Sequence, residues 1–195
     1  MKRILSASAI IFAISIVGLT TYANSPLEAV SEIPAAKQSL SGKYLTSRQA
    51  YQRLTNDENI IFIDVRDTVE VATSGHPANI DAIIPLKIQT LEFDEVLKEV
   101  KLKENPTFLK EVDEFFRIEG FSKFAMVIVS CGSGVRSAIA ANKLTADGYT
   151  DVWHIPDGYE GDEKPGLNTQ HAWKNAGLPW SKDTVYGSEW QLLVE

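Results

Sequence analysis

Residues 125–148, AMVIVSCGSGVRSAIAANKLTADG, decide how this chain folds and where its chemistry lies. The apolar run Ala125–Val129 predicts a buried strand, and the segment after the loop predicts a helix that ends at Gly148. Between them lies a short loop that carries the only cysteine of the chain, Cys131. At the start of such a helix, backbone N–H groups and the helix dipole converge on one point. We therefore expect them to converge on the Cys131 sulfur and to stabilise its thiolate.

Cys131 has two interpretations. A free cysteine is most often a small buried hydrophobic residue, and that interpretation stays open. The neighbouring residues favour a reactive thiol instead. Gly132 and Gly134 suit a backbone that curls around a group, and Arg136 places a permanent cation in the same turn. A cysteine that only packs needs neither feature, so we favour a nucleophile.

The loop has the spacing C-x-x-G-x-R and resembles the active-site loop of the rhodanese family of sulfurtransferases. Further stretches resemble motifs of that family in the same order, and they are Ile61–Asp67 (IFIDVRD), Glu70, Gly75–Pro77, Ile83–Pro85, Gly158-Tyr159 and Trp173–Pro179. Each motif is weak alone, but the ordered set is specific. The resemblance covers about residues 44–180.

The resemblance implies an α/β fold with a central, mainly parallel sheet of about five strands and helices on both faces. It implies that Cys131 is the catalytic nucleophile and that no metal or cofactor is needed. The residues that would bind substrate and shape the loop are Gly132, Ser133, Gly134, Val135 and Arg136. The apolar run Ile60–Asp64 independently predicts a strand buried on both faces. Asp64 and Arg66 then lie at its carboxyl end, either as a structural ion pair or in the chemistry itself.

The sequence divides into four parts. We expect a signal peptide over residues 1–23, a flexible N-terminal arm over 24–43, the rhodanese-like domain over 44–180, and a C-terminal tail over 181–195 that packs on the domain.

Local patterns predict several elements within the domain. Thr46–Gln49 has the form of a capping box, and a charged insertion is expected to be helical over residues 93–100. A core-facing helix is expected to carry the stripe Phe108, Leu109, Val112, Phe115 and Phe116. Residues 157–170 are expected to form a solvated loop, with a lid or a docking loop as alternatives.

Three side chains outside the loop are expected to have structural rather than catalytic roles. Glu70 is expected on a helix surface, and His76, between Gly75 and a proline, is expected to stabilise a turn. His154 is expected on the polar face of a strand.

The first 23 residues predict export. Lys2 and Arg3 precede the apolar stretch Ile4–Leu19, and Thr21–Ala23 has a small-x-small cleavage pattern. An uncleaved membrane anchor is the alternative, but serines and a glycine interrupt the apolar stretch. We expect cleavage, export to a bacterial periplasm, and no stable membrane association afterwards. A single thiol fits this compartment because no disulfide can form within the chain.

Charge narrows the partners. The chain has a formal net charge of −7, with 19 basic and 26 acidic residues, and cleavage would remove two of the basic ones. An acidic chain without a basic cluster argues against nucleic acid or an anionic lipid surface as the partner.

Loop length separates the sulfurtransferase interpretation from other cysteine chemistries. Tyrosine phosphatases and related arsenate reductases resemble C-x5-R, whereas only Gly132–Val135 separate Cys131 from Arg136 here. The shorter loop has room for one extra sulfur atom rather than for a tetrahedral oxyanion. A Cys/His protease is disfavoured because none of the three histidines lies in a protease-like segment.

The sequence therefore predicts sulfur transfer through a Cys131 persulfide. Thiosulfate or 3-mercaptopyruvate would be the small sulfur donor, and cyanide or a thiol the acceptor. The second hypothesis is a binding module that carries sulfur to an exported protein partner without independent turnover.

Overall fold

A computed structural model describes residues 33–96, 98–162 and 171–187. Its centre is a parallel sheet of four strands in the order β3-β1-β6-β7. The strands are β1 (Ile61–Asp64), β3 (Ala82–Ile83), β6 (Met126–Ser130) and β7 (Asp151–His154). The expected α/β class is therefore confirmed, with four strands in this sheet rather than about five. Residue Tyr44 makes only an isolated parallel bridge with His154 and does not extend the sheet by a full strand.

The register of β1 and β6 brings the predicted site residues at their carboxyl ends together. β1 and β6 pair in parallel from Ile61 with Val127 to Asp64 with Ser130. The carboxyl ends of both strands therefore meet at one edge of the sheet, where open parallel sheets place their ligand sites. Cys131 directly follows Ser130, the residue of β6 that pairs with Asp64.

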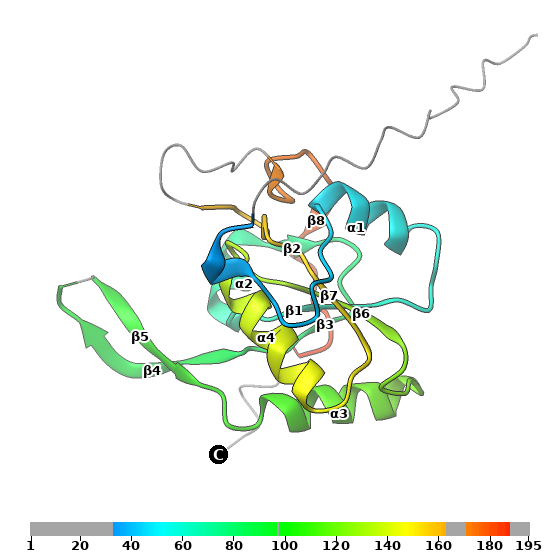
Figure 1. Ribbon diagram of the computed structural model, residues 1–195. Helices are drawn as coiled ribbons and strands as arrows, with labels where there is room; N and C mark the ends of the chain where they lie inside the picture. The colour runs from blue at the N-terminus through cyan, green and yellow to red at the C-terminus, as the bar shows by residue number, and fades with distance from the viewer. Residues whose placement is uncertain (1–32, 97, 163–170, 188–195) are drawn as a thin grey trace, which may run out of the picture.

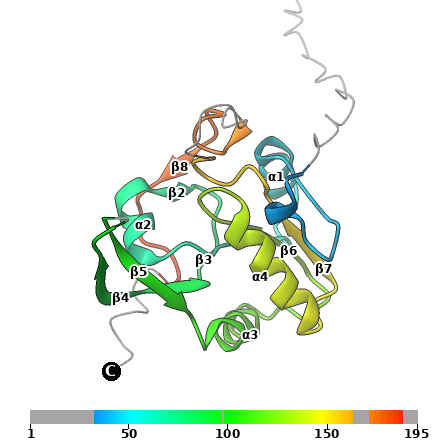
Figure 2. The ribbon, with the colours of Figure 1, turned by 60° about the vertical axis from the view of Figure 1, so that its left-hand side comes forward.

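Helices cover both faces of the sheet (Figures 1 and 2). The helices of one face are α3 (Phe108–Glu119) and α4 (Val135–Ala146), and α1 (Ser47–Leu54) covers the other. The sheet therefore separates two hydrophobic cores, the first beneath α3 and α4 and the second beneath α1. Successive side chains of β1 alternate between them, since Ile63 packs in the first core and Phe62 in the second. Every residue of β1 is buried, as a strand covered on both faces requires.

The start of α1 and the end of α3 follow from local chemistry. Thr46 caps α1 by accepting the N–H of Gln49, and the Gln49 side chain accepts the N–H of Thr46. α3 ends at Gly120, which adopts the left-handed conformation. The predicted stripe of α3 is confirmed, with Leu109 only partly buried and the others fully buried.

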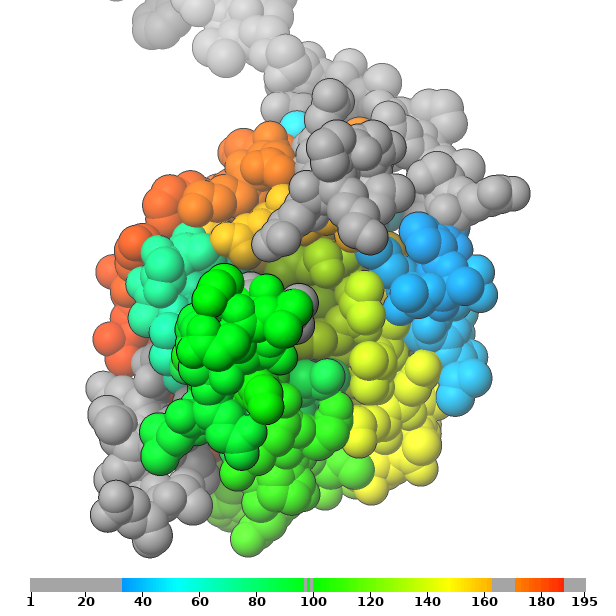
Figure 3. Space-filling view, turned by 90° about the vertical axis from the view of Figure 1, so that its left-hand side faces the viewer, coloured from blue at the N-terminus to red at the C-terminus, as the bar shows by residue number. Residues whose placement is uncertain are grey.

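The charged insertion is a hairpin, so the expectation of a helix over residues 93–100 is wrong. β4 (Lys87–Asp94) pairs in antiparallel fashion with β5 (Glu99–Glu104). The sequence Val100–Lys103 alternates apolar and basic residues, a period of two that favours a strand over a helix. The hairpin projects from the domain in Figure 1 and points towards the viewer in Figure 3. Its exposed apolar side chains are Leu91, Phe93, Val96, Val100 and Leu102.

Both ends of the described chain pack on the domain. The 3-10 helix η1 (Ala35–Lys37) lies against α4, and Lys37 is buried in an ion pair with Asp162 at 2.6 Å. The expectation of a loose arm therefore does not hold for these residues. At the other end, β8 (Trp180–Ser181) pairs with β2 (His76–Pro77), and Tyr186 packs against the first core.

The expected signal peptide, residues 188–195 of the expected tail and residues 163–170 of the expected 157–170 loop lie outside the described residues. Among the helices that the structure describes, none is both long and apolar enough to cross a membrane.

Candidate active site

The Cys131 loop is shaped by one glycine that no other residue can replace without a clash. Gly134 has φ +95°, and a Cβ there would lie 2.0 Å from the carbonyl oxygen of Pro156. The backbone can therefore turn into α4 only because this position has no side chain. The turn directs the first amides of α4 back towards Cys131.

Two backbone amides and one hydroxyl surround the Cys131 sulfur. The N–H of Gly134 donates to Sγ at 3.1 Å, and the N–H of Ser137 donates to it at 3.3 Å. Ser137 Oγ lies 3.6 Å from Sγ. Donors in this arrangement stabilise negative charge on sulfur. Cys131 itself is 1% exposed, so only a small part of it meets solvent.

The residues predicted to shape the loop, Gly132–Arg136, supply only part of this cradle. Of these residues, Gly134 donates its amide to the sulfur. Ser137 contributes both an amide and a hydroxyl, and it was not among the predicted residues. Its position in the first turn of α4 is the signal that would have found it, because unpaired amides extend through that turn.

A second segment holds the outer side of the loop. The carbonyl of Cys131 accepts the N–H of Tyr159 at 2.7 Å, and the carbonyl of Gly132 accepts the N–H groups of Glu160 and Gly161. Gly158 allows this approach, since a Cβ there would lie 2.3 Å from the Gly132 oxygen. The other two predicted loop residues, Ser133 and Val135, are partly exposed.

Arg136 is not a free cation. Its guanidinium makes a two-pronged ion pair with Glu70, with Nη2 and Oε1 2.6 Å apart. Burial alone would raise the pKa of Glu70, but the hydrogen bonds and charge of Arg136 outweigh it and lower the pKa to about 2. The expectation that Glu70 is simply a helix-surface residue is therefore wrong.

Glu70 is held in place by the start of its own helix. α2 (Thr68–Ser74) begins with Asp67 as its cap, and the Glu70 carboxylate accepts the N–H of Asp67. Asp67 accepts the N–H of Glu70 in return, which completes a capping box. Burial raises the pKa of Asp67. The same box therefore starts α2 and positions the partner of Arg136.

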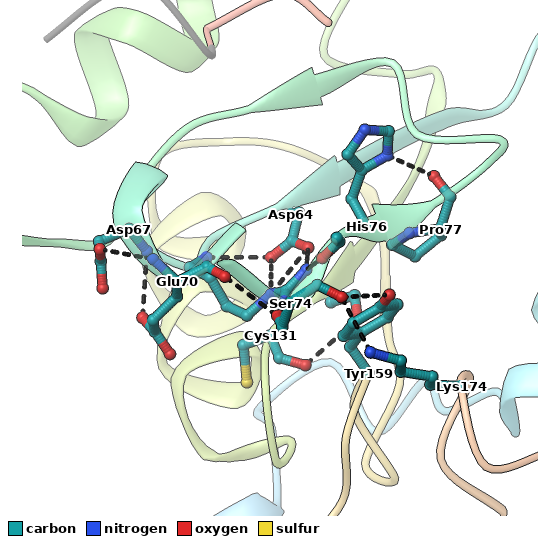
Figure 4. A network of polar contacts seen from close by, with 12 residues as sticks. Asp64, Asp67, Glu70, Ser74, His76, Pro77, Cys131, Tyr159 and Lys174 are labelled. Atoms are coloured by element: carbon teal, nitrogen blue, oxygen red, sulfur yellow. Dashed lines mark hydrogen bonds and ion pairs between the residues drawn. The ribbon is translucent and has the colours of Figure 1, made fainter. Parts of the chain in front are cut away.

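Asp64 and Arg66 form the second ion pair beside the thiol, and both side chains are 0% exposed. Arg66 Nη2 lies 2.6 Å from Asp64 Oδ2, and the guanidinium also donates to Ser74 Oγ and to the carbonyl of Gly75. The Tyr159 ring lies 4.2 Å from the Arg66 guanidinium carbon. Figure 4 shows Asp64, Ser74 and Tyr159 in this network, with Cys131 beside it. The pair thus ties β1, α2 and the Tyr159 segment together.

His76 and His154 lie in different settings from each other. Both ring nitrogens of His76 lie 2.8 Å from backbone carbonyl oxygens, those of Pro77 and Asp183. It therefore holds the β2–β8 region together, as a turn-stabilising residue would. His154, expected on a polar face, is fully buried instead, because α4 packs on β7 and Lys37 of η1 lies near the His154 ring.

A cavity of about 280 Å³ lies away from the thiol. It is lined by residues of β3, β4 and the start of α3, and Cys131 is not among them. Within the described residues, no group of three or more His, Cys, Asp or Glu side chains is placed to hold a metal ion. The arrangement around Cys131 is therefore that of a thiol under converging N–H donors, flanked by two neutralised arginines.

A comparison with protein families gives a match to the rhodanese-like domain over residues 46–164. The chain belongs to the rhodanese-like family. The match includes β1, both ion pairs and the Cys131 loop. All four strands of the parallel sheet also lie within the matched residues.

Individual relatives support the same family. An uncharacterized protein of Rickettsia conorii is 32% identical over 143 residues, which cover 72% of this chain and 98% of that protein. The tRNA uridine(34) hydroxylase of Buchnera aphidicola is 31% identical over 120 residues, 62% of this chain and 31% of that enzyme.

Solved structures share the fold. A protein from M. tuberculosis has a TM-score of 0.53 at 23% identity, and the aligned region covers 72% of this chain and 98% of that protein. A polysulfide-sulfur transferase homodimer from Wolinella succinogenes has a TM-score of 0.50 at 20% identity, with 75% and 82% covered. The chain therefore shares the fold of these two proteins.

Proposed function

We propose that this protein is a sulfurtransferase that carries sulfur as a persulfide on Cys131. The observation that carries the proposal is the pair of backbone amides that donate to Sγ at 3.1 and 3.3 Å. Such donors stabilise a thiolate, and after transfer they remain close enough to stabilise a persulfide. Family membership and the similarity to a polysulfide-sulfur transferase support the same chemistry.

The reaction consists of two displacements. The Cys131 thiolate attacks the outer sulfur of a donor such as thiosulfate, and sulfite leaves with the electron pair of the broken S–S bond. With 3-mercaptopyruvate, the carbon–sulfur bond breaks and the pyruvate fragment takes up a proton. The outer sulfur of the Cys131 persulfide is then attacked by cyanide or a thiolate, and the Cys131 thiolate leaves. The enzyme returns to its starting state with no cofactor in the cycle.

Charge around the sulfur sets the choice of donor. Arg136 attracts an anion less strongly than a free guanidinium would, because Glu70 shares its charge. Glu160 lies nearby, with Oε2 3.9 Å from where a Cβ of Gly132 would be. The groups around Cys131 therefore attract the thiosulfate dianion only weakly. Binding of a donor with a lower charge depends less on this attraction.

The alternative is a sulfur carrier that serves an exported protein partner without independent turnover. The exposed apolar side chains of the β4–β5 hairpin favour it, since Leu91 and Val96 are 106% and 88% exposed. The slight exposure of Cys131 is also compatible with a thiol that reacts only when a partner docks. In both cases, we propose that the protein acts in a bacterial periplasm after cleavage near residue 23.

One experiment separates these functions. The purified protein is incubated with thiosulfate or with 3-mercaptopyruvate, and intact-mass spectrometry records whether one sulfur atom is added. Turnover is then measured with cyanide, and Cys131→Ser is the control. Addition of sulfur with turnover, both lost in Cys131→Ser, supports the enzyme. Addition of sulfur that only a co-purifying protein discharges supports the carrier. No added sulfur from either donor contradicts both.

Localisation needs its own test. Fractionation of cells that express the full chain should place the protein in the periplasm, with a mature N-terminus near residue 24. Recovery in the membrane fraction with residues 1–23 attached would contradict this.

A further inference from the structure

His154 is a buried histidine that the reaction above does not use. It ends β7 and pairs with Val129 of β6, two residues before Cys131. Its ring meets the Tyr44 ring edge-on, with centroids 5.1 Å apart. Burial lowers the pKa of His154 to about 4, so the imidazole is neutral near pH 7.

A chain of side chains links this imidazole to the thiol. His154 Nδ1 lies 3.4 Å from Ser137 Oγ, and Ser137 Oγ lies 3.6 Å from Cys131 Sγ. Ser137 Oγ is also 3.0 Å from the carbonyl oxygen of Gly134. The Ser137 hydroxyl has one proton for these three neighbours. The partner that receives this proton decides whether the Ser137 hydroxyl donates a hydrogen bond to the sulfur.

The position of the imidazole proton follows from burial. His154 Nε2 has no partner in hydrogen-bonding geometry among the described residues, although an interaction with the Lys37 backbone favours a proton on the ring. A proton on Nε2 would therefore have only this poorly aligned acceptor, whereas a proton on Nδ1 has Ser137 Oγ at 3.4 Å. We take the Nδ1 proton as part of the inference, donated to Ser137 Oγ. The favoured tautomer thus leaves the Ser137 hydroxyl proton available to other groups.

We propose that His154 is a positioning residue for sulfur transfer, whose Nδ1–H holds Ser137 Oγ so that the Ser137 hydroxyl donates to the anionic Cys131 sulfur. The inference rests on the proposed function, because it concerns the thiolate and persulfide of that cycle. In the thiol state, the S–H of Cys131 donates to Ser137 Oγ and the hydroxyl donates to Gly134. When the sulfur becomes anionic, the hydroxyl rotates towards it. No covalent bond changes in this step.

The rotation leaves the carbonyl of Gly134 with a hydrogen-bond partner. The carbonyl of Gly134 also accepts the N–H of Ala138 at 3.3 Å, so it stays satisfied when the Ser137 hydroxyl turns away. The donated Nδ1–H makes the Ser137 hydroxyl a stronger donor, since hydrogen bonds in a chain polarise one another. The sulfur then has three donors, two amides and one hydroxyl.

The charged groups near His154 keep its protonation state fixed. Lys37 faces the ring from η1 and disfavours a second positive charge there, although Asp162 partly neutralises it. From α4, the Ser137 hydroxyl contacts the imidazole, and Tyr44 contributes a neutral ring. The imidazole should therefore stay neutral across the pH range in which cysteines react.

The test measures alkylation of Cys131 by iodoacetamide as a function of pH, together with persulfide formation. The variants are Ser137→Ala, His154→Phe, the double variant, and His154→Asn, whose amide N–H can replace Nδ1–H. Loss of one hydrogen bond to a charged sulfur should slow persulfide formation about tenfold in Ser137→Ala and in His154→Phe. The double variant should be no slower, and His154→Asn should recover most of the rate.

The pH profile separates positioning from simple structural support. In Ser137→Ala and His154→Phe, the pH of half-maximal alkylation should move upward, whereas the wild-type protein should show one transition. Additive effects in the double variant, or a His154→Asn protein as slow as His154→Phe, would overturn the inference. So would a second transition near neutral pH that disappears in His154→Phe, because His154 would then titrate.

A measurement on the wild-type protein keeps the inference testable if a variant does not fold. The 15N chemical shifts of the His154 ring should show a proton on Nδ1, and a proton on Nε2 would contradict the proposal. Failure of the proposed function looks different. In that case alkylation would still depend on Ser137 and His154, but no donor would add sulfur to Cys131. If instead sulfur is added equally in His154→Phe, only this inference fails.

Discussion

Two arginine–carboxylate pairs lie beside the same thiol, and they differ in how much water reaches them. Asp64 and Arg66 are both 0% exposed, whereas the Arg136 and Glu70 side chains are 19% and 32% exposed. Arg66 also donates to two groups of the α2 end and stacks on Tyr159. Arg136 has Glu70 as its charged partner. The first pair therefore builds the edge of the sheet, and the second sets the charge at the mouth of the site.

The energetic consequence of breaking each pair follows from burial. A charge left alone in the interior keeps its full desolvation penalty, whereas a partly exposed one is rehydrated. The two pairs offer the same bidentate chemistry at two depths. Comparing them isolates the effect of depth on stability and on donor binding.

The largest effect is expected from Asp64→Asn. This substitution leaves the Arg66 guanidinium buried without its countercharge and should lower the free energy of unfolding by about 3–5 kcal/mol. Urea denaturation followed by circular dichroism measures the change. Replacement of both partners by apolar residues, Asp64→Leu with Arg66→Met, should be less damaging than Asp64→Asn alone. A loss below about 1 kcal/mol for Asp64→Asn would show that the pair does not brace the fold.

The two pairs also differ in how far the sequence could reveal them. Asp64 and Arg66 lie two residues apart at the end of an apolar run, so a local pattern was enough to place them together. Glu70 and Arg136 are 66 positions apart, and only the parallel register of β1 and β6 brings them into contact. His154 was misplaced for a similar reason, because strand alternation cannot show that α4 packs on β7 and that Lys37 of η1 lies near the ring.

The hairpin shows a different limit of sequence reasoning. Charged and apolar residues mix in the insertion, and the alternation in Val100–Lys103 covers only four residues. Such a short pattern does not distinguish a strand from the helix expected over residues 93–100. The core elements were easier to predict because burial on both faces imposes a long apolar run on β1 and a regular stripe on α3. Where tertiary burial does not constrain the pattern, the sequence carried less information.

A smaller effect on stability and a visible effect on function are expected from Glu70→Gln. The free energy of unfolding should fall by about 1–2 kcal/mol, since the pair is charge-assisted but partly exposed. Arg136 would then be free to bind an anionic donor, and the KM for thiosulfate should fall roughly three- to tenfold, equivalent to about 1 kcal/mol. Steady-state kinetics with thiosulfate and cyanide measure this.

The control for this variant is the donor itself. A donor with a lower charge than thiosulfate should gain less from Glu70→Gln, so the ratio of the two KM values should change in favour of thiosulfate. A KM for thiosulfate that rises in Glu70→Gln would mean that Glu70 orients Arg136 for binding instead of competing with the donor.

The pH dependence of stability gives a further comparison. The folded-state pKa of Glu70 is depressed to about 2 from an ordinary value of 4.5. Its contribution is therefore fully present above about pH 4.5 and is lost as the pH falls towards 2. Thermal melts of the wild-type protein and Glu70→Gln should differ at pH 6 and converge towards pH 2. A difference that stays constant over that range would show that the charge of Glu70 is not responsible.

The smallest effect is expected at an ion pair whose two side chains are mostly exposed. Glu95 and Lys98 form an ion pair at 3.0 Å in the hairpin turn, with side chains that are 79% and 71% exposed. Water and salt screen such a pair almost completely, and ordering two long side chains offsets what attraction remains. Glu95→Gln should therefore leave the urea midpoint and the KM for thiosulfate unchanged. Because this substitution makes the same chemical change as Glu70→Gln, it is the matched control for depth. If it shifted the midpoint as much as Glu70→Gln, burial would not be what distinguishes the two arginine pairs, and local hydrogen-bond geometry would have to account for their difference.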